Sequence, residues 1–367
     1  MAIAMFRVVR RYRGVIVLVE MNGRQTKWRT PFVLIGNNEY AIDGSRLGSR
    51  ARVDQGELFV YLTPRSRTRE LPMLLAKALI RSGIAYARGR SGLLCQESDP
   101  MGTIVHLSDI HFGRVDTRLV APLIQTVEAV APDLVAVSGD LTQRARRSQF
   151  RQARMFLNRL SFPLLVVPGN HDVPLFNLAA RLLDPYGGYR RHIQRDMEPV
   201  FENEQMIAVG LNSARAFPFH GGGRLSETQV ERAAVRLRSA PEQAIRIVVT
   251  HHPFDLPETH GDEHLVGRSD MAMRQLAAAG ADVFLAGHLH VSHVGHSAQR
   301  YQIAGHSALV VQAGTMSTRS RGEASTINVL RVAPGRIEIE RHSWDEATQS
   351  FRPSWNGSFR RTDAGWF

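Results

Sequence analysis

Cysteine is almost absent: Cys95 is the single one in 367 residues. One thiol can neither close an intramolecular disulfide nor build a thiolate metal cluster. Long apolar runs are absent too. None approaches the roughly 18 residues of a membrane span, and Val15–Val19 is too short for the apolar core of a signal peptide. We therefore expect a cytoplasmic protein, with peripheral contact to a membrane surface left open.

Two common catalytic motifs are missing as well. No G-x-S-x-G nucleophile elbow stands at the end of an apolar run, so a Ser/His/Asp triad gains no support. The glycine run 221–223 is followed by Arg224 and lacks the Lys-Ser/Thr ending of a phosphate-binding P-loop. We interpret the run as a loop, with Arg224 as a candidate for contact with a substrate phosphate.

Positive charge is concentrated at the N-terminus. Of 46 Lys and Arg and 34 Asp and Glu, residues 1–98 hold 17 and 7, which leaves 29 and 27 for the rest. A basic segment of this kind suits anionic lipid, nucleic acid or an acidic partner, and it equally suits a solvated basic surface.

The composition changes near residues 88–100, where Gly, Ser and Pro accumulate without periodicity. Short β-branched and aromatic runs precede this break, followed by one helical stretch at 71–82. The sequence thus predicts a β-rich domain over residues 1–90, a linker over 91–100 and a second domain over 101–367.

The second domain alternates strands with helices. Apolar runs typical of buried strands lie at 103–109, 133–140, 164–170, 206–212, 245–252, 283–288 and 308–314. A capping box of Ser226 and Gln229 predicts one helix start, and Gly280 predicts the end of another helix over 270–279. A hairpin around Pro334-Gly335 closes the pattern. This order predicts an α/β fold with β-sheet between helical layers.

Almost every predicted strand runs into side chains that can bind metal ions. These residues are Asp109, His111, Asp140, Asn170, His171, His251, His252, His288 and His290. Ligands bind at the carboxyl ends of strands in α/β sheets, so we expect these side chains to converge.

Spacing inside the clusters adds to this expectation. Asp109 and His111 are two residues apart, as are His288 and His290. In an extended chain such residues point the same way, so each pair can hold one site. Gly139, Gly169 and Gly287 stand beside the clusters and permit sharp turns.

Over about residues 101–350 the chain resembles the calcineurin-like metallophosphoesterase family, in the branch with bacterial enzymes similar to cyclic-nucleotide phosphodiesterases. The resemblance implies a layered α/β/β/α sandwich and a site for two ions. One ion would be held by Asp109, His111, Asp140 and His290. The other would be held by Asp140, Asn170, His251 and His288, so that Asp140 bridges both.

The resemblance also assigns the remaining motif residues. His171 matches the family's catalytic histidine, which contacts a phosphate oxygen or protonates the leaving group, and Asp172 would fix its tautomer. His251 is the ligand because it stands two residues before Pro253, while His252 either supports a ligand or is packed.

The chemistry that follows is hydrolysis of a phosphomonoester or phosphodiester. Two cations would generate a hydroxide for in-line displacement, and His171 would act as electrostatic stabiliser or general acid. Carboxylate, amide and imidazole ligands suit manganese, iron or zinc alike.

The insertion at 173–205, with Tyr186 and Tyr189, is expected either to cap the site and select substrate or to fill structure. His293, His296 and His306 lie beyond the last motif, and we favour packed or surface roles for them.

Residues 20–82 resemble the second domain of bacterial diacylglycerol and sphingosine-type lipid kinases, through 30–40 and 51–62. The kinase nucleotide-binding lobe and its Gly-Gly-Asp-Gly motif are missing, so kinase activity is not implied. The segment either packs on the phosphoesterase or brings it to lipid head groups.

Two other functions use the same fold. DNA-repair exonucleases share the metal motifs, but a nuclease should carry positive charge beside its site, whereas the excess here is N-terminal. Nucleic acid is therefore the less favoured partner. A non-catalytic scaffold, like the retromer subunit of this fold, has no need of His171 or a complete ligand set.

Overall fold

The computed structural model describes residues 101–217, 222–256, 264–319 and 322–367 in full and the backbone of five N-terminal strands. The chain divides into two compact units, Met1–Pro100 and Met101–Phe367. None of the described helices combines the length and the apolar character needed to span a bilayer.

The N-terminal unit contains antiparallel strands. β1 (Val15–Met21) pairs with β2 (Arg24–Thr30), and β3 (Val33–Asn37), β4 (Glu57–Leu62) and β5 (Ala85–Arg90) form a separate sheet in that order. Three of these strands lie in the β-rich runs expected from the sequence. The helix expected at 71–82 and the linker at 91–100 lie outside the described residues, as do most residues of the lipid-kinase resemblance.

The second unit contains two mixed sheets. One has the order β18-β17-β16-β15-β6-β7-β8, and the other β13-β14-β12-β11-β10-β9. The first comprises β6 (Gly102–Leu107), β7 (Leu134–Val137), β8 (Leu164–Val166), β15 (Thr326–Ala333), β16 (Arg336–Asp345), β17 (Ser350–Thr362) and β18 (Gly365–Trp366). The second comprises β9 (Val200–Glu202), β10 (Met206–Gly210), β11 (Ile245–Val249), β12 (Val283–Ala286), β13 (His293–His296) and β14 (Leu309–Gln312).

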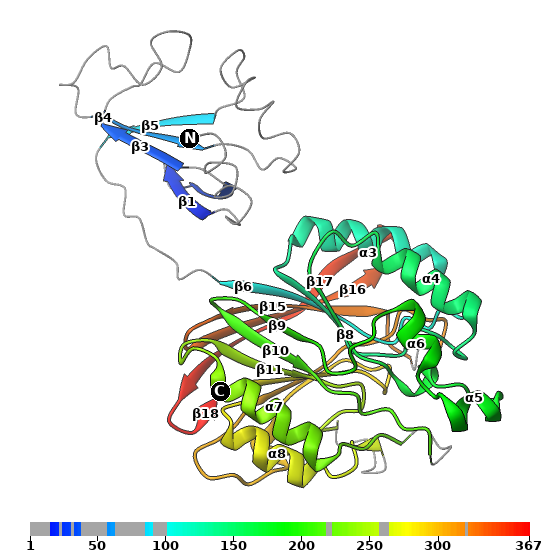
Figure 1. Ribbon diagram of the computed structural model, residues 1–367. Helices are drawn as coiled ribbons and strands as arrows, with labels where there is room; N and C mark the ends of the chain where they lie inside the picture. Colours follow the sequence, from blue (N-terminus) through cyan, green and yellow to red (C-terminus); the bar gives the residue numbers. More distant parts are fainter. Residues whose placement is uncertain are drawn as a thin grey trace, which may run out of the picture. The chain divides into compact units, whose positions relative to one another are not determined.

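Helices cover the outer faces of both sheets (Figure 1). α3 (Thr117–Val130) and α4 (Arg147–Leu157) pack on the first sheet, and α7 (Glu227–Ser239) and α8 (Ser269–Ala278) pack on the second. Two short helices, α5 (Leu178–Leu183) and α6 (Gly187–His192), follow β8.

The strands are apolar on both faces because each sheet is covered on both sides. In β6, Ile104 faces the core between the two sheets, whereas the next residue, Val105, faces the core under α3 and α4. In β11, Ile247 and Val248 divide in the same way between the inner core and the helical layer of α7 and α8.

All seven apolar runs expected to form strands in this unit do so, and the hairpin of β15 and β16 is confirmed. The hairpin does not close the fold, however. β17 continues the sheet beyond β16 and pairs with β18. Apolar alternation gives little sign of β17 because most of its side chains are exposed and Pro353 interrupts it.

Both expected helix signals are also confirmed. The Ser226 hydroxyl accepts from the backbone N–H of Gln229, and the Gln229 side chain accepts in return from the N–H of Ser226. α8 ends before Gly280, which takes a φ of 79°, the left-handed conformation that glycine adopts without strain.

The capping box yields a stability prediction. Ser226→Ala removes an acceptor for an N-terminal N–H of α7 and should lower the free energy of unfolding by about 1 kcal/mol. Urea denaturation of the full-length protein measures the change. Glu231→Gln, at an exposed position on the same helix, is the control. Equal stability of the two variants would contradict the role of the cap.

Candidate metal centre

The turns that follow β6, β7, β8, β11 and β12 meet at one edge of the sandwich and bring the motif residues together. Four groups of His and Asp ligand atoms lie there, the atoms of each group within 4.8 Å of one another. His171 joins one group, and Asn170 adds a side-chain oxygen beside His251 and His288.

A first cluster contains Asp109, His111 and His290. Asp109 Oδ1 lies 3.5 Å from His111 Nε2 and 3.2 Å from His290 Nε2. The two ring nitrogens lie 3.0 Å apart. All three residues are buried. Two imidazole nitrogens and a carboxylate oxygen thus point at one small volume.

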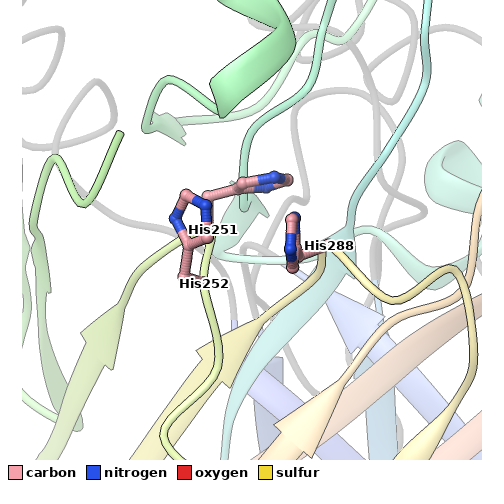
Figure 2. Close-up of side chains that lie close together, drawn as sticks. All are labelled: His251, His252 and His288. Carbon is pink, nitrogen blue, oxygen red and sulfur yellow. The ribbon is translucent and has the colours of Figure 1, made fainter. Parts of the chain in front are cut away.

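A second cluster contains Asn170, His251 and His288. Asn170 Oδ1 lies 3.0 Å from His251 Nε2 and 3.1 Å from His288 Nδ1. Figure 2 shows the rings of His251 and His288 gathered together, the first from the end of β11 and the second from the turn after β12. The ring of His252 lies beside them.

Asp140 stands between the two clusters. Its Oδ2 lies 3.6 Å from His111 Nε2 on one side and 3.4 Å from His251 Nε2 on the other. Its second oxygen, Oδ1, accepts a hydrogen bond from the backbone N–H of His171 at 2.8 Å. One carboxylate oxygen is therefore held at the boundary of both clusters, where a bridging ligand must be.

The donor set fits metal ions better than it fits internal hydrogen bonds. Asp109 Oδ1 is buried beside the ring nitrogens of His111 and His290, yet within the described part of the chain it has no hydrogen-bond partner. Buried polar atoms without a partner cost free energy and are rare in folded proteins. Converging imidazole nitrogens and carboxylate oxygens without a thiolate are the ligands that manganese, iron and zinc accept.

Hydrogen bonds outside the clusters orient two imidazoles. His251 Nδ1 donates to the carbonyl of Ser138 at 2.8 Å, and His290 Nδ1 donates to the carbonyl of Arg319 at 3.1 Å. With Nδ1 occupied in this way, Nε2 of each ring is left to face the site.

The site's electrostatics follow from burial and from the carboxylates. Burial alone would lower the pKa of His251, but the charge of Asp140, its hydrogen bond and the charge of Asp109 together raise it to about 9. Burial lowers the pKa of His288, and the neighbouring imidazoles His252 and His251 lower it further. For Asp140, the surrounding histidines outweigh burial, so that its pKa is lowered and the carboxylate stays ionised.

The backbone departs from the extended geometry assumed from the sequence. Asp109, His111, Asp140, His288 and His290 all have φ between 52° and 76°, in the left-handed region that few residues other than glycine adopt. Consequently the two-residue spacing does not place each pair in one site. Asp109 and His111 do share the first cluster, but His288 belongs to the second cluster and His290 to the first.

Neighbouring glycines allow these turns to approach one another. Gly139 has a φ of 92°, and Gly169 lies so close to Asp140 that a methyl group on Gly169 would collide with the carboxylate and with the backbone nitrogen of Asp140. Gly287 leaves space in the same way for the side chains of Ser108 and Asp109. Gly139 therefore permits a sharp turn, as expected, whereas Gly169 and Gly287 permit close packing of neighbouring turns.

His171 stands at the rim of the site. Its ring lies 4.9 Å from the ring of His111, measured between centroids, and its Nδ1 donates to the carbonyl of Gln143 at 2.9 Å. Arg319 Nη1 lies 3.4 Å from the other ring nitrogen, Nε2. Burial, opposed by the charge of Asp140, lowers the pKa of His171. The lowered pKa favours the neutral imidazole.

Asp172 does not contact the His171 ring, so the expected control of the tautomer by Asp172 is wrong. Its carboxylate accepts instead from the backbone N–H groups of Gly169, Leu141 and Thr142 and from the Thr142 hydroxyl. These bonds tie the turn after β8 to the turn after β7. The Gln143 carbonyl performs the orienting role at His171.

His252 and Arg224 lie on the side of the second cluster. Buried His252 has its Nδ1 2.9 Å from the hydroxyl of Ser213, and its ring centroid lies 4.5 Å from that of His288. Arg224 is exposed, and its backbone N–H donates to the carbonyl of Ser213. A ring nitrogen of His252 lies within 4.8 Å of the ligand nitrogens of His251 and His288.

The insertion at 173–205 forms α5, α6 and β9. Its tyrosines face the protein: the hydroxyl of buried Tyr189 donates to Val166, and that of Tyr186 donates to Ala214. They anchor the insertion to the sheet.

The later histidines also lie outside the two clusters. His293 Nε2 lies 4.0 Å from Asp255, and His296 stacks on Phe367. His306 lies in the turn before β14.

Three polar groups near His171 were not singled out from the sequence. Gln143 and Arg144 directly follow the motif that contains Asp140, and their position after a strand-end motif was the available signal. Arg319 comes from a loop about 150 residues away and carries no motif; only the fold places it at His171.

Comparisons with known proteins agree with this architecture. A family model described as calcineurin-like phosphoesterase matches residues 102–292. Glycerophosphodiester phosphodiesterase GpdQ of Enterobacter lignolyticus is 34% identical over 171 residues, which are 43% of this chain and 60% of that protein. The 3',5'-cyclic adenosine monophosphate phosphodiesterase CpdA of Escherichia coli is 25% identical over 224 residues, 59% of this chain and 74% of that protein.

Among solved structures, a dimetal phosphatase from Danio rerio superposes with a TM-score of 0.53 and 12% identity, over 72% of this chain and all of that one. At this identity the likeness concerns the fold alone, an α/β architecture with two mixed sheets.

The packing of Gly169 on Asp140 yields a prediction about metal binding. Gly169→Ala should displace the Asp140 carboxylate and weaken metal binding by about 10- to 100-fold, as loss of a supporting contact does in other metal sites. Gly222→Ala is the control, because a methyl group there meets nothing within 4 Å. Metal content after dialysis reports the difference; a Gly169→Ala protein that keeps its full metal content would contradict this role.

Proposed function

Because the chain belongs to the calcineurin-like phosphoesterase family, we propose that it hydrolyses phosphodiester bonds with two bound metal ions. The observation that carries the proposal is the position of Asp140 Oδ2, between a cluster with His111 and a cluster with His251. Two cations about 3.5–4 Å apart are the usual arrangement for displacement at phosphorus.

The two relatives support a diester substrate. One is named for glycerophosphodiesters and the other for cyclic adenosine monophosphate, and both names describe diesters of phosphate. A small phosphodiester is therefore the substrate class we propose here. Catalysis is favoured over a scaffold role because His171 and every expected metal position are present and lie together.

The ligand assignment follows the two clusters. Asp109, His111 and His290 would hold one ion, Asn170, His251 and His288 the other, and Asp140 both. When bound, manganese, iron or zinc at these positions supplies an activated water and neutralises charge on the phosphoryl oxygens. Backbone N–H groups hold both carboxylates in place: that of His171 donates to Asp140 Oδ1 and that of His288 donates to Asp109 Oδ2.

His171 would protonate the leaving group. Its Nδ1 hydrogen bond to Gln143 leaves Nε2 to face a bound phosphate, with the Arg319 guanidinium beside it. The negative charge of a bound phosphate favours protonation at Nε2, and that proton can then pass to the departing oxygen. Arg319 and Arg144 add positive charge where negative charge grows.

The start of the insertion would border the substrate. Phe176 is exposed, and its ring lies 5.8 Å from the guanidinium carbon of Arg144, whose Nη1 in turn lies 3.1 Å from His171 Nδ1. We propose that residues 173–205 cap the site from this end.

For the N-terminal segment we keep the domain division at 1–90, 91–100 and 101–367. We also keep the proposal that the basic first domain, similar to part of a lipid kinase, binds anionic lipid. The excess of Lys and Arg over Asp and Glu in this segment supports the proposal.

Metal removal gives the first test. Chelation with dialysis should abolish hydrolysis of bis-p-nitrophenyl phosphate, and manganese, iron or zinc should restore it. Release of p-nitrophenol measures the rate. A metal-loaded protein that turns over no diester would favour a scaffold, whereas manganese-dependent degradation of DNA in preference to small diesters would favour a nuclease.

His171→Ala gives the second test. The variant should keep its metal content and lose about 10²- to 10⁴-fold in kcat, the usual contribution of a positioned acid or base. His306→Ala removes a histidine outside both clusters and should leave kcat unchanged. Unaltered turnover in the His171 variant would reject its proposed role.

A further inference from the structure

A cavity of about 460 Å³ lies between the segment after β10 and the starts of α7 and α8. Three arginines, Arg215, Arg224 and Arg268, line it together with Phe217. Its floor is backbone: the N–H of Gly267 donates to the carbonyl of Gly223 at 2.8 Å. The proposed function makes no use of this cavity.

Among the described residues that line the cavity, three are arginines and none is acidic. Arg224 and Arg268 form neither an ion pair nor a side-chain hydrogen bond with any described residue. Arg215 is fixed by hydrogen bonds to the carbonyl of Arg224 and to Gln229. Burial first, and the charges of Arg224 and Arg268 in addition, lower the pKa of Arg215. The three guanidinium groups therefore share one electrostatic environment.

The cavity and the metal centre share a wall. Gly223 packs so tightly on His252 that a methyl group at Gly223 would overlap the imidazole ring. On its other side the ring of His252 lies 4.5 Å from the ring of His288, between centroids. A single layer, the His252 side chain, thus separates the cavity from the second metal cluster.

We propose that the arginine-lined cavity is a second anion site, which binds a phosphate monoester group carried by the substrate at a distance from the diester that is cleaved. This inference rests on the proposed function and narrows its substrate class. Three guanidinium groups suit a phosphate dianion, with three oxygens to share, better than a carboxylate with one charge. The N-terminal end of α7, at Ser226, adds its own partial positive charge.

The consequence is a preference for diesters with a terminal phosphate. Cyclic adenosine monophosphate and diesters with an uncharged second alcohol lack a group for this cavity, so they should bind more weakly. The substrates proposed here thus carry a terminal phosphate that the names of the two relatives, glycerophosphodiester and cyclic adenosine monophosphate phosphodiesterase, do not mention.

Binding to the metal-free protein tests the site without catalysis. Isothermal titration with inorganic phosphate should detect one site in the full-length protein. Arg224→Gln with Arg268→Gln should weaken it at least tenfold. The matched control is Arg236→Gln with Arg238→Gln, which removes two exposed charges from α7 outside the cavity and should leave binding unchanged. Equal affinities of both double variants, or no binding by the wild type, would overturn the proposal.

Kinetics with a matched pair of substrates separates this proposal from the proposed function. p-Nitrophenyl 3-hydroxypropyl phosphate and its terminal phosphate ester differ only in the second phosphate. The metal-loaded wild type should show a KM about tenfold lower for the phosphorylated compound. In Arg224→Gln with Arg268→Gln the ratio of the two KM values should fall to about one. Hydrolysis of both with equal KM in the wild type would reject the second anion site alone, whereas hydrolysis of neither would reject the proposed function.

Discussion

The Asp140 carboxylate is the contact on which the site depends. One oxygen stands between His111 and His251, and the other is held by the backbone N–H of His171. It therefore joins the two sheets of the sandwich, because His111 follows a strand of one sheet and His251 a strand of the other. Without Asp140 the first cluster would keep the carboxylate of Asp109, but the cluster of Asn170, His251 and His288 would have no carboxylate of its own and the two clusters would share no ligand.

This arrangement of ligands requires an unfavourable backbone conformation. Left-handed φ angles at residues with a Cβ are unfavourable by about 1–2 kcal/mol each, and five of the expected ligands adopt them. Backbone hydrogen bonds between turns, such as that from His111 N–H to Asp140 at 2.9 Å, and close packing at Gly169 offset part of this cost. Strain of this kind collects at functional sites, where the surrounding structure enforces it.

Much of the fold could be predicted because strands buried on both faces are continuous apolar runs, and the turn residues that follow them are distinctive. The limits are equally physical. β17 is mostly exposed and carries little apolar pattern, and the partition of His288 from His290 depends on left-handed turns that spacing alone cannot show. The roles of Asp172 and Arg319 could not be predicted either. Asp172 was expected at the ring of His171 but bonds the backbone of Leu141, whereas Arg319, which no motif marks, lies beside that ring. Contacts between distant loops are a property of the tertiary structure.

The side chain of His252 lies between the second metal cluster and the cavity that Arg215, Arg224 and Arg268 line. The central claim remains the shared carboxylate. Anomalous X-ray diffraction from metal-loaded crystals tests it most directly. The account predicts two peaks roughly 3.5–4 Å apart on either side of the Asp140 carboxylate. A single peak, or two peaks of which neither touches Asp140, would contradict it.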